Sequence, residues 1–337
     1  MRSKEIIKKA LIKLSPSYRK IDRIQKDVNQ IKAGTIGKMS PGAVSESNIF
    51  IDRKKNYDTM LIILAGYKKD LWDITIERIH QFLPEKIDVC IVTSGKDDET
   101  LKEYCIKYNW SYLGTDVNCL TLAQNLAIDY HPAAEWIYKI DEDMFITEGF
   151  FENMKSTYQM ALTGHYVPGF VAPLINVNGY GYIRILERLG LLDDYELHFG
   201  KAAYTDGLTH HREVILNTNF AKYMWGVSKE ELRSIDKLNR IFQSDPPSYS
   251  ICALRFSIGA ILFTRSMWLS WGRFPVPAKG NGLGLDEEAV CWRSMFQSRV
   301  IIVSDNSVVG HLGFGGQSKE MTKYYLANRE LFLVSTD

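Results

Sequence analysis

The sequence lacks a long apolar run: no stretch of this 337-residue chain approaches the length of a membrane-spanning helix. Cysteine is scarce, with five scattered residues and no pair at metal-binding or redox spacing, so we expect reduced thiols without a disulfide or a zinc site. The formal net charge of +1 argues against a nucleic-acid-binding protein. The N-terminus opens with charged residues rather than the apolar core of a signal peptide, and we therefore expect a cytoplasmic location.

Residues 1–50 differ in composition from the rest of the chain. Apolar residues recur at helical spacing between many lysines and arginines, and residues 34–47 are rich in glycine, serine and proline. We expect a basic amphipathic helical extension followed by a linker. Its basic faces suit contact with an anionic membrane surface, which would place the protein peripherally at the inner face of the membrane. Packing of these helices, or formation of a homo-oligomer through them, is the alternative.

From residue 58 onward, strand-like and helix-like patterns alternate. Residues 59–64 and 87–92 are apolar runs typical of parallel strands buried on both faces, and each precedes a helical pattern. Further strands are expected at residues 110–113, 136–140, 170–176, 255–264 and 300–305, and helices at residues 72–82, 100–108, 120–129, 180–191 and 266–271. The alternation predicts an α/β fold with a mixed, mostly parallel central sheet flanked by helices. Ligands of such sheets gather beyond the carboxyl ends of the strands.

An acidic triplet is the feature that most constrains function. The apolar run Trp136–Ile140 leads directly into Asp141, Glu142 and Asp143. Side chains alternate along a strand, so Asp141 and Asp143 would point the same way from a rigid sheet edge. Two carboxylates placed in this way suit Mg2+ or Mn2+, which complete their coordination with water and substrate phosphates such as a diphosphate. The alternative is that the triplet is only the polar end of a strand.

A second acidic block follows the glycine-rich residues 280–284. Asp286, Glu287 and Glu288 stand at the start of an amphipathic segment that contains Arg293. Acidic residues are favoured at a helix N-terminus by the backbone dipole, which is the simpler interpretation. The functional interpretation is that one carboxylate removes a proton from an attacking hydroxyl.

The order of these motifs resembles that of GT-A fold glycosyltransferases, most closely glycosyltransferase family 2. The resemblance covers roughly residues 58–150 and 255–316. It is carried by the helical stretch 122–128 with Asn125, the strand that ends in the acidic triplet, the block at Asp286 and Glu287, and His311 before a glycine-rich loop. The resemblance implies a GT-A (Rossmann-like) fold. It would have a nucleotide-sugar-binding half at residues 51–165 and an acceptor-binding half at residues 166–337.

The resemblance also assigns roles to individual residues. Asp143 would bind the metal directly, Asp141 would hold the metal and ribose region, and His311 would be a further metal ligand, although a lone histidine is more often structural. Manganese suits this oxygen and nitrogen set better than magnesium. Gln124 stands where the family often has arginine. The residues expected to border the nucleotide-sugar are Ala65, Gly66, Tyr67, Thr93, Ser94, Asn125, Asp141 and Glu142.

The implied activity is that of a metal-dependent inverting glycosyltransferase, of the hexosyl- or N-acetylhexosaminyltransferase type, in polysaccharide or glycan biosynthesis. The donor would be a nucleotide-diphosphate sugar, with UDP as the first choice, and the acceptor a hydroxyl of a saccharide or a lipid-linked saccharide. Glu287 is the expected base and Asp286 the residue that orients the acceptor hydroxyl, but their order reverses the family's commoner one, so either could be the base. A sugar nucleotidyltransferase and a non-catalytic glycan- or nucleotide-binding assembly partner are the alternatives.

Overall fold

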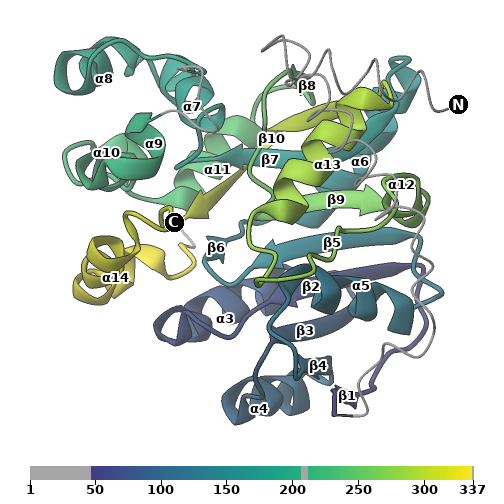
Figure 1. Cartoon of the computed structure of the whole chain (residues 1–337). Helices are drawn as coiled ribbons and strands as arrows, with labels where there is room; N and C mark the ends of the chain where they lie inside the picture. Colours follow the sequence, from purple (N-terminus) through teal and green to yellow (C-terminus); the bar gives the residue numbers. More distant parts are fainter. Residues whose placement is uncertain (1–46, 206–211, 336–337) are drawn as a thin grey trace, which may run out of the picture. The chain divides into compact units, whose positions relative to one another are not determined.

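The computed structural model describes residues 47–205 and 212–335 (Figure 1). The described residues belong to a single compact unit, which spans residues 47–337. The predicted helical extension and nearly all of the linker lie outside the described residues. This unit contains the alternating α/β region, and its first strand, β1 (Ile49–Ile51), begins just after the predicted linker.

The described residues form one mixed sheet with the strand order β1-β4-β3-β2-β5-β9-β7-β10-β6, and β8 also pairs with β10. Strands β2, β3, β4, β5, β7 and β10 run in one direction, whereas β1, β6, β8 and β9 run in the other. The expected mixed, mostly parallel sheet is therefore confirmed. The strands after β1 are β2 (Thr59–Leu64), β3 (Asp88–Ser94), β4 (Ser111–Thr115), β5 (Trp136–Asp141), β6 (Met144–Phe145), β7 (Pro168–Ile175), β8 (Tyr249–Cys252), β9 (Ala260–Thr264) and β10 (Val300–His311).

Helices flank this sheet, and Figure 1 shows α8, α9 and α10 clustered away from β1 to β4. The helices are α3 (Trp72–Phe82), α4 (Glu99–Tyr108), α5 (Leu120–Tyr130), α6 (Phe150–Thr163), α7 (Gly181–Leu189), α8 (Leu192–Phe199), α9 (Arg212–Leu216), α10 (Thr218–Met224), α11 (Ile235–Gln243), α12 (Arg265–Ser270), α13 (Leu285–Phe296) and α14 (Ser318–Ala327). Short 3-10 turns at Lys69–Leu71, Glu230–Leu232 and Arg329–Phe332 complete the described elements.

The parallel half of the sheet forms where the sequence alternates most regularly. Every residue of β2 and β3 is buried, as expected for strands covered by helices on both faces. Strand β2 lies between β3 and β5, and Leu64 is in register with both Val92 and Asp141. That register places the carboxyl ends of three strands at one edge of the sheet, which we call the rim.

Several elements differ from the sequence expectations, and the strand expected at residues 255–264 begins only at Ala260. The helix expected at residues 180–191 corresponds to α7, which ends at Leu189 because Gly190 adopts a left-handed C-cap conformation with φ 69, and a second helix, α8, follows at Leu192–Phe199. Strand β10 was expected to end near residue 305, yet it continues to His311 beyond an irregularity between Ser304 and Val308. A bulge of this kind bends a strand without ending it, so the apolar residues on both sides belong to one element.

Within residues 47–205 and 212–335, no helix is both long and apolar enough to span a bilayer. All five cysteines are buried and free. Burial raises the pKa of Cys105 and of Cys291 to about 12, so these two thiols are protonated and weakly reactive at neutral pH.

Candidate active site

The short strand β6 brings Asp143 and His311 together. Asp143 lies between β5 and β6, and β6 pairs antiparallel with the end of β10. In this pairing His311 is opposite Met144, and the backbone N–H of Leu312 donates to the carbonyl of Asp143 at 3.3 Å. Two residues that are 168 positions apart in the sequence are therefore neighbours at the rim.

Asp143 is a buried carboxylate with two basic partners. Its Oδ2 atom lies 3.1 Å from Nε2 of His311 and also accepts a hydrogen bond from Nζ of Lys68. Burial alone would raise the pKa of Asp143, but the charges of His311 and Lys68 outweigh burial and hold the pKa well below its usual range. Burial would lower the pKa of Lys68, yet Asp143 reverses that effect and the pKa is raised. The Asp143 carboxylate and the Lys68 ammonium group are therefore both charged at neutral pH.

Asp141 has a different partner, the buried lysine two residues earlier in β5. Nζ of Lys139 lies 2.6 Å from the Asp141 carboxylate and donates to the carbonyl of Ile258 at 2.8 Å. Although part of the Asp141 side chain is exposed at the rim, burial raises its pKa to about 6, even with Lys139 opposing the shift. The nearby carboxylates of Asp143 and Asp286 also raise this pKa. Asp286 therefore acts on Asp141 through its charge.

Glu142, the middle residue of the triplet, holds the turn that follows β2. Its carboxylate accepts hydrogen bonds from the backbone N–H groups of Gly66 at 2.8 Å and Tyr67 at 3.0 Å, and from Nε1 of Trp72 at 2.5 Å. The backbone of Gly66 has φ 142, a conformation that residues other than glycine rarely adopt. Glu142 therefore shapes the turn at Ala65–Tyr67, and a contact of Glu142 with a nucleotide stays a prediction.

The residues expected beside the nucleoside lie at the ends of β2 and β3. Tyr67 is 64% exposed, and its hydroxyl donates to the carbonyl of Ser94 at 2.7 Å. Thr93 is buried, and its hydroxyl donates to the carbonyl of Lys96 at 2.7 Å. Nζ of Lys96 lies 5.4 Å from the centre of the Tyr67 ring. This part of the rim offers an exposed aromatic ring and an ammonium group next to the turn after β2.

Asn125 uses its side chain inside the protein. Its Nδ2 donates to the carbonyl of Phe274 at 2.9 Å, and its Oδ1 accepts from Nε1 of Trp268 and from the N–H of Phe274. The residue is 1% exposed. In this arrangement Asn125 fixes the segment after α12, and its predicted contact with the donor remains untested.

The second acidic block lies at the start of α13 and is tied to α5. Nε2 of Gln124 donates to Oδ2 of Asp286 at 2.9 Å, and the N–H of Leu120 donates to the carbonyl of Asn281 at 2.8 Å. Asp286 is 3% exposed, and its other oxygen accepts from the N–H of Glu287. Gln124, which stands where the resembling enzymes often have arginine, therefore contacts the acidic block.

Glu287 has a less buried carboxylate than Asp286. Nε of Arg255 lies 2.5 Å from its Oε1 atom. Arg255 comes from the segment that leads into β9, so the acidic block is held from two directions, by α5 through Asp286 and by this segment through Glu287. An arginine partner keeps a carboxylate ionised and fixes its direction.

The rim thus gathers Asp141 at the end of β5, Asp143 between β5 and β6, His311 at the end of β10 and Lys68 after the turn that follows β2. Among the described residues, no group of three or more His, Cys, Asp or Glu side chains is arranged to hold a metal ion. Asp143 and His311 are in contact, whereas Asp141 faces Lys139. The three expected metal ligands, Asp141, Asp143 and His311, therefore lie at one rim, but their side chains are not already arranged around a common metal position.

The two lysines of the rim did not emerge from the sequence patterns. Lys139 could have been found, because it stands two residues before Asp141 and therefore on the same face of the strand. Lys68 had no such pattern, since its contact with Asp143 depends on the shape of the turn that Glu142 holds.

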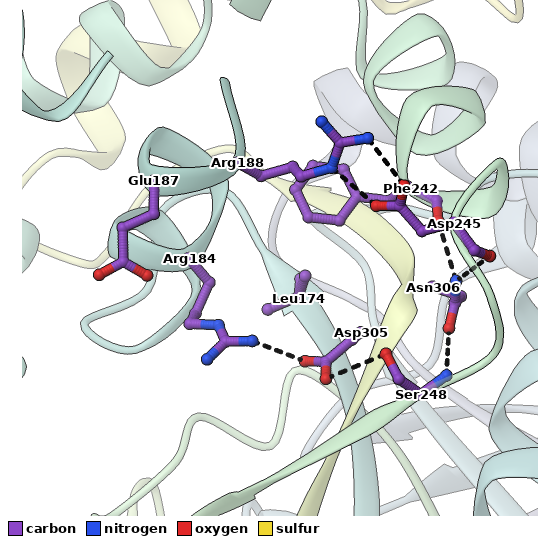
Figure 2. A pocket seen from close by; sticks show the side chains of 9 residues that line it. All are labelled: Leu174, Arg184, Glu187, Arg188, Phe242, Asp245, Ser248, Asp305 and Asn306. Atoms are coloured by element: carbon purple, nitrogen blue, oxygen red, sulfur yellow. Dashed lines mark hydrogen bonds and ion pairs between the residues drawn. The ribbon is translucent and has the colours of Figure 1, made fainter. Parts of the chain in front are cut away.

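A separate cavity of about 390 Å3 lies between α7, α11 and β10, and none of its lining residues belongs to the rim (Figure 2). Two ion pairs cross it. Arg188 bonds both oxygens of Asp245, at 2.7 and 2.8 Å, and Arg184 lies 3.6 Å from Asp305. We call this cavity the arginine pocket.

No protein-family model matches the chain, and no curated protein matches it in sequence. Among solved structures, the chain is similar to GalNAc-T7 crystallised with UDP, GalNAc and Mn2+, with 11% identity, a TM-score of 0.43 and coverage of 78% of this chain and 45% of that one. A crystal structure described only as a mycobacterial protein has 12% identity, a TM-score of 0.40 and coverage of 91% of this chain and 79% of that one. The chain thus spans less than half the length of the first structure.

Both likenesses are distant. The fold assignment rests on the strand order and strand directions of this chain, with the acidic triplet placed after β5 at the carboxyl edge. These features define a GT-A-like mixed α/β fold, as the resemblance in sequence predicted.

Proposed function

We propose that this chain is a glycosyltransferase that moves a sugar, with inversion, from a nucleotide-diphosphate donor to a hydroxyl of a saccharide or lipid-linked saccharide. UDP is the first-choice nucleotide. The observation that supports this most is the contact of the buried carboxylate of Asp143 with His311 and Lys68 at the rim, together with the acidic block that Gln124 and Arg255 hold at the start of α13. Transfer of a sugar needs positive charge for the departing diphosphate and a base for the acceptor, and these side chains offer both.

On the donor side, Asp143 and His311 are the residues that would hold a divalent cation. The fit is chemically sound, because a carboxylate oxygen beside the nitrogen of a neutral imidazole suits Mn2+. When bound, the cation would neutralise charge on the leaving diphosphate. Asp141 would act at the ribose and metal region while paired with Lys139. Tyr67, with its exposed ring, would border the nucleoside.

On the acceptor side, Glu287 would take the proton from the attacking hydroxyl. Arg255 orients its carboxylate, and the neighbouring Asp286 is fixed by Gln124. Asp286 is 3% exposed, whereas the Glu287 side chain is 14% exposed, and this greater exposure favours Glu287 as the residue that meets the acceptor hydroxyl. The proton moves from the acceptor oxygen to a Glu287 oxygen as that acceptor oxygen attacks the anomeric carbon.

A screen of nucleotide-sugars with Mn2+ or Mg2+ tests the proposal, first by thermal shift and then by nucleotide release. Glu287→Gln should keep the donor-induced thermal shift and lose transfer by a factor of about 100 or more, as expected when a general base is removed. Glu288→Gln, an exposed neighbour on the same helix, is the matched control and should transfer normally. NMR of the anomeric proton of the product checks inversion.

Three outcomes would overturn parts of this proposal. If no nucleotide-sugar shifts the melting temperature, the chain is not a donor-dependent transferase. Release of pyrophosphate instead of a nucleoside diphosphate would identify a nucleotidyltransferase. Normal transfer by Glu287→Gln would remove Glu287 from the role of base.

A further inference from the structure

Lys68 differs from the other rim lysine in how it is held. Its backbone is fixed on both sides, because the N–H of Tyr67 donates to Glu142 and the Lys68 carbonyl accepts from the N–H of Leu71 at 2.9 Å. Its side chain is 36% exposed and its ammonium group contacts Asp143. Lys139, by contrast, is 2% exposed and is held by two oxygen atoms at once. Lys139 is therefore a buried counter-charge, whereas Lys68 is held through its backbone and reaches Asp143 with a partly exposed side chain.

The ammonium group of Lys68 and a divalent cation would need the same oxygen atom. Lys68 contacts Oδ2 of Asp143, which is also the atom that faces Nε2 of His311. A cation bound between Asp143 and His311 would therefore have to displace Lys68 from that oxygen. The four-carbon stem of lysine allows the displacement, and an ammonium group donates readily to phosphate as a compact point charge.

We propose that Lys68 is an exchangeable counter-ion of the donor site. It contacts Asp143 until a divalent cation takes that carboxylate, and its ammonium group then turns to the diphosphate of the donor. This inference rests on the proposed function and deepens it, because it couples cation binding to nucleotide binding. Lys68 competes with the cation when no nucleotide is bound, and it adds affinity for the diphosphate once the cation is in place. The cation and the nucleotide consequently favour each other.

The test measures binding rather than turnover. Mn2+ affinity is measured without nucleotide, by electron paramagnetic resonance of free Mn2+, and UDP affinity is measured by calorimetry with saturating Mn2+. Lys68→Gln should bind Mn2+ more tightly, by roughly 5- to 10-fold, and bind UDP more weakly by a similar factor, within the usual range of coupling between sites. A gain in Mn2+ affinity together with a loss of UDP affinity distinguishes exchange from simple damage to the site, which would weaken the binding of both ligands.

Lys69→Gln is the matched control. Lys69 is the next residue, is exposed, and donates to the hydroxyl of Thr100 at 3.0 Å, away from Asp143. The Lys69→Gln substitution should leave the affinities for Mn2+ and for UDP unchanged. The same pair of variants is compared by thermal unfolding, so that a general loss of structure in Lys68→Gln would be seen directly.

Unchanged or weaker Mn2+ binding by Lys68→Gln would overturn the competition, and unchanged UDP binding would overturn the contact with diphosphate. The inference and the proposed function fail in different ways. Sugar transfer that needs no divalent cation would leave the proposed transferase standing and remove the exchange. Tighter Mn2+ binding together with weaker UDP binding by Lys68→Gln, in a chain that transfers no sugar, would leave the exchange standing and remove the transferase.

Discussion

The rim and the arginine pocket both pair carboxylates with basic residues, but with different basic residues. In the arginine pocket, Arg188 contacts both oxygens of Asp245 through a planar guanidinium. At the rim, Asp143 is paired with a single ammonium group and an imidazole. A guanidinium and a carboxylate form a two-point contact with fixed geometry, whereas an ammonium group is a compact charge on a flexible stem. The pocket therefore holds two segments of chain together with a fixed pair, while the ammonium group at the rim suits the exchange proposed above.

Burial separates the two regions further. The Asp143 side chain is 5% exposed, whereas the side chains of Arg188 and Asp245 are 43% and 40% exposed. Water screens the Arg188–Asp245 pair in the pocket, so this pair adds little to the net stability of the protein. The Asp143 charge is screened far less, so its loss should affect any charged ligand of the rim.

The largest expected effect is that of Asp143→Asn on sugar transfer. The amide keeps the shape of the side chain but removes the charge that holds Lys68 and His311, and with it the proposed cation site. We expect transfer to fall by a factor of about 1000, as when a group that stabilises transition-state charge is removed. Asp245→Asn in the arginine pocket is the control and should leave transfer unchanged. Initial rates of nucleoside diphosphate release measure both variants, and normal rates for Asp143→Asn would contradict the proposed site.

A smaller but still large effect is expected from a third kind of pair, in which an arginine is fully buried. Arg78 is 1% exposed and bonds both oxygens of Asp236, as well as the carbonyls of Ile146 and Phe332. Asp236→Asn leaves this guanidinium without a counter-charge, and we expect a loss of about 3 kcal/mol in the free energy of unfolding. Urea unfolding measures the change. If Asp236→Asn and the exposed Asp245→Asn have the same midpoint, burial does not decide the importance of these pairs.

Most of the parallel half of the sheet could be predicted from the sequence. The ends of β2 at Thr59 and Leu64 match the apolar run, because a strand buried on both faces leaves a continuous apolar pattern. The expected helix runs past the end of α7 because one glycine, Gly190, ends a helix whose apolar pattern continues. The course of β10 was missed because the polar residues near Asp305 resemble a strand end, although they form a bulge within the strand.

The candidate site was predictable only in part. The meeting of Asp143 with His311 follows from the order of motifs, and the structure brings them together. The sequence could not reveal which polar side chains the protein uses for its own hydrogen bonds. Glu142 holds the turn after β2, and Asn125 holds the segment after α12. Such partners lie far apart in the chain, so no local pattern records them.

The smallest expected effects come from the two aspartates of the arginine pocket, Asp245 and Asp305, whose pKa values move in opposite directions. Burial raises the pKa of Asp305, although Ser250 and Arg184 oppose the shift. Hydrogen bonds from Arg188 lower the pKa of Asp245. An unfolded aspartate has a pKa of about 3.9. Asp305 therefore contributes stability that is present below about pH 3.9 and lost as pH rises through its folded pKa, whereas the contribution of Asp245 is present above about pH 3.9 and lost as pH falls through its folded pKa.

Replacing each carboxylate with an amide should therefore change the pH dependence of stability with opposite sign. As pH rises, Asp305→Asn should gain stability relative to the wild type, because the variant no longer ionises a carboxylate whose charged form burial disfavours. Asp245→Asn should lose stability relative to the wild type over the same rise, because Arg188 no longer faces a charge. Melting temperatures of the three proteins between about pH 3 and 7 test this. Parallel curves for the two variants would show that the two carboxylates share one environment, and the contrast within the arginine pocket would then be wrong.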